Sequence, residues 1–535
     1  MSTGKIQHSG RRWWTVTALL AVGCLGVSAW LVPTAAERWD DLAWEELFGG
    51  ASELSLPEPS VIPAHVRRYD AEAPLPQPEA VRQALAAARP IGLHGTWGGQ
   101  VVDVVTGQVL SADSADTAFI PASNLKVLTA FALLSHHQAS DRFETAAYAV
   151  PAAESAESAA EVPTVVLRAG GDTLLSPGEG DPGAVLGHAG LRDLAEQAVK
   201  DLVEQGVSGA VPVALDESIF PGEPINPSWA PEDVAAGYVT GIHPIALWDH
   251  HTQRPAAGEE HEHRSQNAAA EAHAAFIDAL NAAGQTAGIS FEKAAGSPQL
   301  PEEDGQRASR KIGQVESATV LEQAHYMLEN SDNVLAEVLG RMAAVAAGEE
   351  GTLAGARTTI THTLSRAGVS RDGLHLADLC GLSMQNRVTP QTLVQTLQAS
   401  LGGISSRAAE AGAAEGSPGT ESAAGGEADG GSSHAASHGA GMIRSLGDPA
   451  LLASALPVAG GSGTLIERFE DPEESAAVGF ARAKTGTLLS VSSLTGITQT
   501  SQGRLLAYAF VLNDVEDTAA ARDALDRAVA ALSTL

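Results

Sequence analysis

The stretch that decides the fold runs Pro121-Ala122-Ser123-Asn124-Leu125-Lys126-Val127-Leu128-Thr129-Ala130-Phe131-Ala132-Leu133-Leu134. It predicts a short loop and then a helix that begins near Ser123 and, being apolar almost all round, is buried. Ser123 and Lys126 interrupt the apolar run and, three residues apart, share one face of the first turn. Two interpretations are open for this pair: a nucleophilic hydroxyl with an amine base, or a capping serine followed by a lysine that extends its amine to solvent.

Two further motifs help to choose between these interpretations. Ser331-Asp332-Asn333 lies at a break between two helices predicted within residues 318–347, and Lys484-Thr485-Gly486, followed by Thr487, lies on a predicted strand. Each motif alone has an ordinary structural reading, as a helix cap or as a turn between strands. In this order and on these elements, the three motifs are typical of serine acyl-transferases that act on D-Ala-D-Ala peptides and β-lactams.

The chemistry suggests a role for each catalytic candidate. A serine hydroxyl needs a base within hydrogen-bond reach, and Lys126 can be that base only while it is neutral. Burial and a second ammonium on Lys484 both favour the neutral amine. Ser331 is expected to relay the proton to the leaving amine, and Asn333 to hold both Lys126 and the substrate amide.

The substrate-binding candidates lie on the predicted strand. Gly486 allows the strand to approach the substrate backbone closely. Thr485 and Thr487, together with Lys484, are expected to bind a terminal carboxylate. The backbone N–H groups of Ser123 and Thr487 are expected to form an oxyanion hole, one of them at a helix N-terminus.

Composition excludes some classes of protein. The chain of 535 residues has a net charge of −33 and no basic stripe, which argues against nucleic-acid binding. Its two cysteines are Cys24, inside the N-terminal apolar run, and Cys380, so a disulfide framework is not expected.

The N-terminal part predicts export. Residues 1–12 are basic and residues 13–32 are apolar without a charge, followed by small residues up to position 36. This pattern fits either a secretory signal or an uncleaved membrane anchor, and its flanking charges place the remainder of the chain outside. Residues 37–80 are rich in proline and are expected to be a linker.

The folded part is expected to be a catalytic domain made of residues 81–145 and 318–535, split by an inserted α+β region at 146–317. Residues 403–440 contain almost no large apolar side chain and are expected to be a disordered insertion. Near the C-terminus, residues 481–491, 493–500 and 504–513 predict three antiparallel strands, and residues 518–532 a closing helix.

Two segments, one glycine-rich and one polar, are further candidates for a site. The turn Gly460-Gly461-Ser462-Gly463 is interpreted as a scaffold for the floor of the active site, since a phosphate cradle needs a following helix of another kind. A histidine-rich segment has two readings, a metal site or a solvated loop, and the loop is expected. That segment contains Asp249, His250, His251, Glu259, Glu260, His261, Glu262 and His263.

With these motifs the chain resembles the low-molecular-mass class C penicillin-binding proteins, the D-alanyl-D-alanine carboxypeptidases and endopeptidases of peptidase family S13. The long separation of Ser123 from Ser331 fits this family, and Ile245-Ala246-Leu247 and Cys380 are departures from its usual pattern. The further matching segments are Gly170-Gly171-Asp172, Asp216-Glu217-Ser218-Ile219-Phe220, Trp229 with Gly237-Tyr238, Asp378-x-x-Gly381-Leu382-Ser383-x-x-Asn386-Arg387-Val388-Thr389-Pro390, and residues 456–465.

The resemblance implies an α+β fold of the penicillin-recognising serine transferases, with a five-stranded antiparallel sheet flanked by helices. It implies an exported serine D-Ala-D-Ala carboxypeptidase, or one that is also an endopeptidase, that acts on peptidoglycan stem peptides and is acylated by β-lactams. No metal or organic cofactor is implied, and any membrane contact is made by the N-terminal segment alone. The alternatives are a β-lactamase and a non-catalytic cell-wall scaffold of the same fold.

Overall fold

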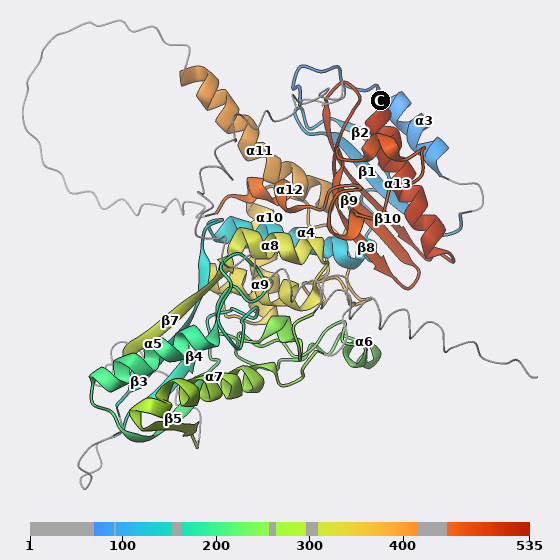
Figure 1. The fold of residues 1–535 in the computed structure, drawn as a ribbon. Helices are drawn as coiled ribbons and strands as arrows, with labels where there is room; N and C mark the ends of the chain where they lie inside the picture. Colours follow the sequence, from blue (N-terminus) through green and yellow to red (C-terminus); the bar gives the residue numbers. More distant parts are fainter. Residues whose placement is uncertain (1–68, 90–92, 152–161, 256–263, 296–308, 415–446) are drawn as a thin grey trace, which may run out of the picture. The chain divides into compact units, whose positions relative to one another are not determined.

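The structure of the protein is a computed structural model that describes residues 69–89, 93–151, 162–255, 264–295, 309–414 and 447–535. The described strands form two five-stranded sheets, shown in Figure 1. The first sheet has the strand order β2-β1-β10-β9-β8, and the second has the order β6-β5-β4-β3-β7. No helix among these residues is both long and apolar enough to span a membrane, and the apolar run at 13–32 lies outside them.

The first sheet joins the two ends of the folded chain and is antiparallel throughout. It therefore confirms the expected five-stranded antiparallel sheet, including the three C-terminal strands. Its strands are β1 (Thr96–Asp103), β2 (Val109–Asp113), β8 (Arg482–Leu488), β9 (Val491–Gln499) and β10 (Leu505–Asn513). The central strand β10 is buried on both faces, so its sequence is a continuous apolar run without alternation.

Helices cover both faces of this sheet. On one face, Tyr508 and Phe510 of β10 pack in a core with α3 (Pro78–Ala88) and α13 (Thr518–Thr534). On the other face, Ala509 and Val511 belong to a larger core to which five helices of ten residues or more contribute. These are α4 (Lys126–His136), α8 (Val320–Glu329), α9 (Asn333–Ala346), α10 (Leu353–Arg366) and α11 (Pro390–Ala414).

The stretch that carries Ser123 begins as a short 3-10 helix, η1 (Ala122–Leu125), and continues as α4. Every residue of α4 from Lys126 to Leu134 is buried, as its all-round apolar pattern predicts.

Helix α11 corrects one predicted boundary. It extends to Ala414, so the expected disordered insertion does not begin at residue 403. The segment from 403 to 414 has few large apolar side chains but is rich in alanine, and helix propensity is sufficient to continue a helix that has already started. Residues 415–446, which hold the rest of the expected insertion, lie outside the described residues.

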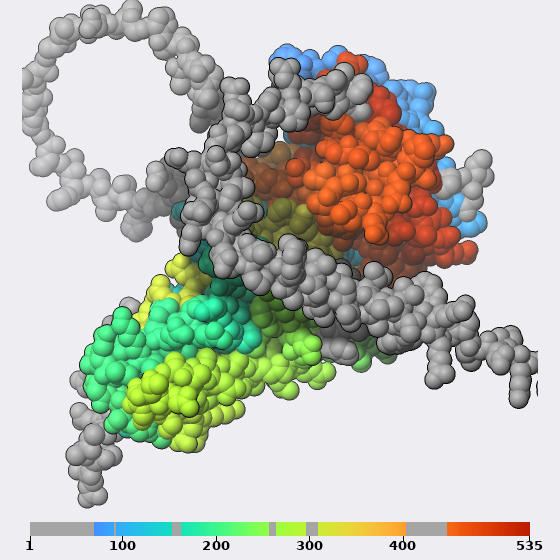
Figure 2. Space-filling view, viewed as in Figure 1, coloured from blue at the N-terminus to red at the C-terminus, as the bar shows by residue number. Residues whose placement is uncertain are grey.

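The second sheet is mixed. Strand β3 (Arg142–Val150) pairs antiparallel with β4 (Thr164–Arg168) and β7 (Arg310–Thr319), whereas β4, β5 (Gly209–Asp216) and β6 (Ile289–Lys293) run parallel. Helices α5 (Leu191–Glu204) and α7 (Ala268–Gly284) pack on this sheet through Leu194, Leu202 and Phe276. Their polar faces lie on the molecular surface, coloured green to lime in Figure 2.

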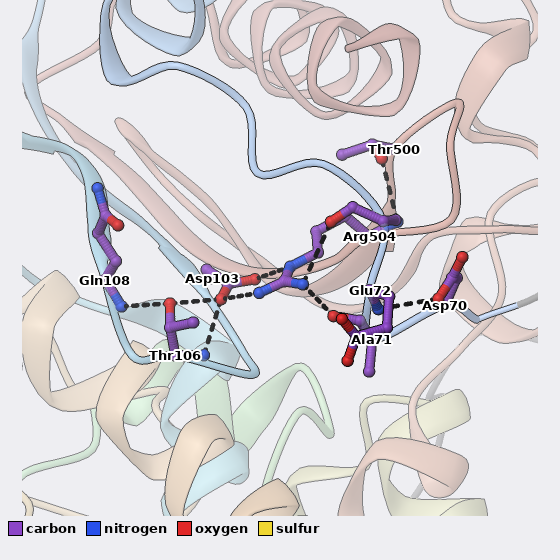
Figure 3. Close-up of polar contacts among 9 residues, drawn as sticks. Asp70, Ala71, Glu72, Asp103, Thr106, Gln108, Thr500 and Arg504 are labelled. Carbon is purple, nitrogen blue, oxygen red and sulfur yellow. Dashed lines mark hydrogen bonds and ion pairs between the residues drawn. The ribbon is translucent and has the colours of Figure 1, made fainter.

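A buried ion pair fastens the chain before α3 to the first sheet, as Figure 3 shows. Arg504, just before β10, donates from Nε to Asp103 Oδ1 (2.6 Å) and from a terminal nitrogen to Asp103 Oδ2 (2.7 Å). The same guanidinium donates to the carbonyl of Ala71, and Asp103 also accepts from the backbone N–H of Thr106 at 2.7 Å. One arginine thus joins the end of β1, the start of β10 and the segment at 70–73.

Candidate active site

The structure brings Ser123, Lys126 and Asn333 together at one point. Lys126 is fully buried, and its Nζ lies 3.0 Å from Ser123 Oγ and 2.7 Å from Asn333 Oδ1. Ser123 and Lys126 come from consecutive helical turns of η1 and α4, whereas Asn333 is the first residue of α9. The site is therefore assembled by packing α4 against α9 in the larger core.

A third partner of Lys126 was not expected from the sequence. The backbone carbonyl of Cys380 accepts a hydrogen bond from Nζ at 2.8 Å. A neutral amine has two hydrogens and one lone pair, so with Asn333 Oδ1 and Cys380 O accepting the two hydrogens, the lone pair faces Ser123 Oγ. Burial lowers the pKa of Lys126 below its ordinary value, an effect that the acidic groups of Asp332 and Asp378 partly oppose.

The turn before Ser123 is held by close backbone contact. Ala122 has a φ of 48°, a conformation that non-glycine residues rarely adopt. Gly381 packs against it with a φ of 91°, and a Cβ at position 381 would lie 1.9 Å from the Ala122 carbonyl oxygen. Gly381 is thus needed for its lack of a side chain, and the loop around it fixes the position of the Ser123 turn.

Asp378 organises that loop. Its two carboxylate oxygens accept from Gly381 N (2.8 Å), Ser383 N (2.6 Å), the Asn386 side-chain amide (2.7 Å) and the Trp229 indole (3.2 Å). Ligand atoms of Glu337, Asp378 and Cys380 all lie within 4.8 Å of one another. Both oxygens of Asp378 are already occupied by these donors, so the donor set fits a backbone anchor better than a metal site.

The Ser331-Asp332-Asn333 motif forms the turn between α8 and α9. Ser331 is half-buried with a φ of 55°, and Asp332 caps α9 by accepting from Leu335 N at 2.9 Å. The ordinary structural interpretation of this motif, a helix cap, is thus present at Asp332. Ser331 and Asn333, which are expected to act in catalysis, lie on either side of it. Asn333 Nδ2 donates to the Tyr238 carbonyl at 3.0 Å, which connects the motif to the region between β5 and β6.

The histidine-rich segment is not a solvated loop where the structure describes it. Asp249 and His250 are each 1% exposed and His251 is 8% exposed, so that prediction is wrong for these three residues. The prediction failed because a polar segment suggests solvent exposure, and the sequence does not show that Arg264 pairs with it. The remaining histidines and glutamates of this segment lie within residues 256–263, outside the described residues.

Arg264 connects this segment to the catalytic turn. Its guanidinium lies 3.1 Å from Asp249 and 2.6 Å from Asp332, and all three side chains are almost fully buried. Burial would raise the pKa of Asp332, but Arg264 outweighs it and holds that pKa below the ordinary value. Burial and the charge of Asp332 instead raise the pKa of Asp249 well above its ordinary value. Asp332 therefore carries the negative charge of this cluster.

The Lys484-Thr485-Gly486 motif lies on β8, the edge strand of the first sheet. Lys484 is fully buried and donates to the Thr485 carbonyl at 2.9 Å, and burial followed by the charge of Lys126 lowers its pKa. A Cβ at Gly486 would lie 2.9 Å from the Pro121 carbonyl oxygen, so β8 approaches the Ser123 turn closely. Thr487 is exposed.

The glycine-rich turn also reaches this strand. Thr485 Oγ1 donates to Thr464 Oγ1 at 2.9 Å, and Thr464 lies in η5 (Gly463–Leu465) directly after the turn. Thr464 and the carbonyls of Cys380 and Tyr238 were not singled out from the sequence. Their only sequence signal was that all three lie in segments noted for other reasons.

Two curated relatives cover most of the chain. Carboxypeptidase DacB of Mycolicibacterium smegmatis is 31% identical over 477 residues, which are 89% of this chain and 87% of the relative. Carboxypeptidase Rv3627c of Mycobacterium tuberculosis is 30% identical over 463 residues, 86% of this chain and 85% of the relative.

Solved structures share the fold at lower identity. The crystal structure of penicillin-binding protein 4 from Haemophilus influenzae is 18% identical, with a TM-score of 0.58 over 85% of this chain and 99% of that chain. A second structure of that protein, complexed with a β-lactam, has a TM-score of 0.51 at 18% identity over 84% and 97% of the two chains.

The model of the D-Ala-D-Ala carboxypeptidase 3 (S13) family matches residues 83–262, 253–411 and 448–534. These ranges include all three motifs and both sheets. The chain therefore belongs to the D-Ala-D-Ala carboxypeptidase 3 (S13) family.

Proposed function

We propose that this protein, a D-Ala-D-Ala carboxypeptidase by family, uses Ser123 as its nucleophile and Lys126 as the general base. The observation that carries this proposal is the environment of Lys126 Nζ. The amine is buried, two acceptors occupy its hydrogens, and Ser123 Oγ lies 3.0 Å away on the remaining side. This arrangement fits a base better than a surface cation.

The proposed acylation step uses each of these groups in turn. The proton of Ser123 passes to Lys126 as Oγ bonds to the carbonyl carbon of the penultimate D-Ala. The backbone N–H groups of Ser123 and Thr487 would stabilise the oxyanion, and one such donor is typically worth about 3 kcal/mol in the barrier. The C–N bond to the terminal D-Ala breaks, and Ser331 relays a proton from Lys126 to the leaving amine.

Deacylation restores the enzyme. A water molecule attacks the acyl carbon, Lys126 accepts its proton, and the peptide leaves with a new carboxylate while Ser123 recovers its hydrogen. Asn333 keeps Lys126 oriented through both steps. Lys484, Thr485 and Thr487 would bind the terminal carboxylate of the substrate. Gly486 would permit the substrate backbone to lie against β8.

The proposal extends to the substrate and the location. The proposed substrate is the stem peptide of peptidoglycan, so the protein would act outside the cytoplasm, exported by residues 1–36 and joined to them by the linker at 37–80. We further propose that residues 146–317 are an insertion into a catalytic domain formed by residues 81–145 and 318–535. β-Lactams would acylate Ser123, as expected for a relative of a protein that was crystallised with one.

Two measurements test the proposed function. Purified wild-type protein should become labelled by a fluorescent penicillin and should release D-Ala from a stem pentapeptide, and Ser123→Ala should do neither. Ser135→Ala is a matched control, because this hydroxyl lies on the same helix and donates back to the Phe131 carbonyl of that helix. Wild-type protein that neither labels nor releases D-Ala would contradict the proposal and favour the non-catalytic scaffold.

The rate of deacylation separates the proposal from the β-lactamase alternative. A carboxypeptidase should keep the penicillin label for minutes or longer, since its site is not adapted to hydrolyse that acyl group. A label that forms on Ser123 and disappears within seconds would favour a β-lactamase instead.

A further inference from the structure

Glu337 is a buried acid next to the proposed catalytic base. It lies one helical turn after Asn333 on α9, so both side chains project from the same face of the helix. Its side chain is fully buried; Oε1 accepts from Leu379 N (2.6 Å) and Cys380 N (3.2 Å), while Oε2 is buried without a hydrogen-bond partner. A carboxyl oxygen left in this state is costly, which points to a task beyond packing.

The contacts of Glu337 lead directly to Lys126. Glu337 holds residue 380 by its N–H group, and the carbonyl of the same residue accepts from Lys126 Nζ. One helix thus fixes both acceptors of the amine, Asn333 directly and Cys380 through Glu337. A shift of Glu337 would rotate the Cys380 carbonyl. The Lys126 amine that donates to this carbonyl would turn with it, so that its lone pair would no longer face Ser123.

Charge is the second link. Glu337 and Asp378 lie within 4.8 Å of each other, and two buried carboxylates at this distance do not readily ionise together. Asp378 accepts four hydrogen bonds from nitrogen donors, whereas Glu337 accepts two from nitrogen donors, both at Oε1. Burial, followed by the charge of Asp378, raises the pKa of Glu337 to about 7.

The other charged groups around this pair are few. Arg341, one turn further on α9, and Arg357 on α10 both interact with the charge of Glu337. Around Lys126, Asp332 and Asp378 stabilise the ammonium together with Glu337, and the charge of Lys126 in turn contributes to lowering the pKa of Lys484 on β8, after burial. The burial of Cys380 raises the pKa of its thiol well above the ordinary value, so the thiol stays neutral.

We propose that Glu337 is a positioning residue that fixes the Cys380 carbonyl against Lys126 and, through its charge, sets the pH at which Lys126 becomes a base. This inference rests on the proposed role of Lys126. An ionised Glu337 favours the ammonium form of Lys126 and therefore delays the appearance of the neutral base as pH rises. Removal of that charge should make Lys126 a base at lower pH.

The test is the pH dependence of the rate at which a fluorescent penicillin acylates Ser123. Glu337→Gln keeps the shape and the acceptor oxygen of the side chain but cannot ionise. We expect the rising, acidic limb of its pH–rate profile to move to lower pH by half a unit or more. Half a unit corresponds to about a threefold change in the neutral fraction of the amine on that limb. Glu337→Asp keeps the charge but shortens the reach to Leu379 N and Cys380 N, so its plateau rate should fall several-fold.

Glu349→Gln is the matched control, because this exposed glutamate lies just beyond the end of α9. It should leave the profile unchanged. A Glu337→Gln profile with the wild-type midpoint would overturn the charge role, and a Glu337→Asp plateau equal to wild type would overturn the positioning role. If Glu337→Gln does not fold, Glu337→Asp carries the test. Absence of labelling in wild type would instead overturn the proposed function itself.

Discussion

At the scale of single residues, the amide of Asn333 has two tasks at once. Its oxygen accepts from Lys126 Nζ, and its nitrogen donates to the Tyr238 carbonyl, so the amide cannot rotate without losing both bonds. The fixed orientation is what presents an acceptor, and not a donor, to the buried amine. A donor at this position would compete for the lone pair that the proposed mechanism needs.

Asn333→Ala should therefore slow acylation by penicillin by about 10- to 100-fold, because Lys126 becomes charged as it accepts the Ser123 proton and a hydrogen bond to a charged group is worth roughly 1.5–3 kcal/mol. Stopped-flow labelling of Ser123 measures this. Asn330→Ala is the control, because this exposed amide three residues earlier bonds only to the Tyr326 carbonyl of its own helix. Equal rates for the two variants would contradict the proposed role of Asn333.

Sequence reasoning at this scale succeeded where side chains carry the signal. Ser123 and Lys126 are three residues apart, and Asn333 belongs to a motif, so their meeting could be expected. The carbonyls of Cys380 and Tyr238 could not, because every residue has a carbonyl and only the folded backbone determines where it points. Arg264 was missed for a related reason, as an isolated arginine does not indicate which acids it will reach.

At the scale of elements, the Asp103–Arg504 pair joins two neighbouring strands of the first sheet where their apolar contacts end (Figure 3). Burial would raise the pKa of Asp103, but hydrogen bonds from Arg504 and Thr106 outweigh it and leave that pKa lowered. A lowered pKa means that the stabilisation is present above the unfolded value of 3.8 and is lost as pH falls through the folded value.

Asp103→Asn should lower the free energy of unfolding by about 3 kcal/mol at neutral pH, because it leaves a buried guanidinium without its counter-charge. Urea denaturation followed by circular dichroism measures the change. The control is Asp113→Asn on β2, whose ion pair with Arg89 is solvent-exposed and should contribute less than about 1 kcal/mol. Similar losses in both variants would refute the importance of burial.

The elements themselves were largely predictable, and the exceptions have physical causes. The apolar run of β10 and the break between α8 and α9 are strong signals, and both are present. The expected start of the disordered insertion, residue 403, is too early because low hydrophobicity suggests disorder, whereas alanine sustains a helix that already has a packed start. The mixed pairing of the second sheet depends on long-range contacts and has no local signature.

At the scale of the whole molecule, buried acids make stability depend on pH. Burial raises the pKa of Asp172 to about 7, although Leu174 N donates to it. A raised carboxyl pKa stabilises the fold below the unfolded value of 3.8, and this contribution is lost as pH rises toward 7. The net charge of −33 acts in the same direction, because self-repulsion grows as carboxyls ionise.

Asp172→Asn should therefore gain stability relative to wild type by about 2–3 kcal/mol between pH 5 and pH 8. Thermal unfolding at several pH values measures the difference. Asp181→Asn is the control, since this exposed aspartate makes the same contact with an N–H two residues on, at Gly183. A pH-independent difference for Asp172→Asn would show that its carboxyl ionises normally.

The β3–β7 ribbon has a consequence for how the chain could be rebuilt. Arg142 at the start of β3 pairs with Thr319 at the end of β7, so the intervening segment leaves and re-enters at neighbouring points. By connectivity alone, a designer could excise it and close the gap with a short turn. Yet the excised piece contains Tyr238 and Arg264, which hold Asn333 and Asp332 from outside. The topology would therefore allow the segment to be removed, but the chemistry would not. A catalytic domain built without this segment would need other groups to make both contacts.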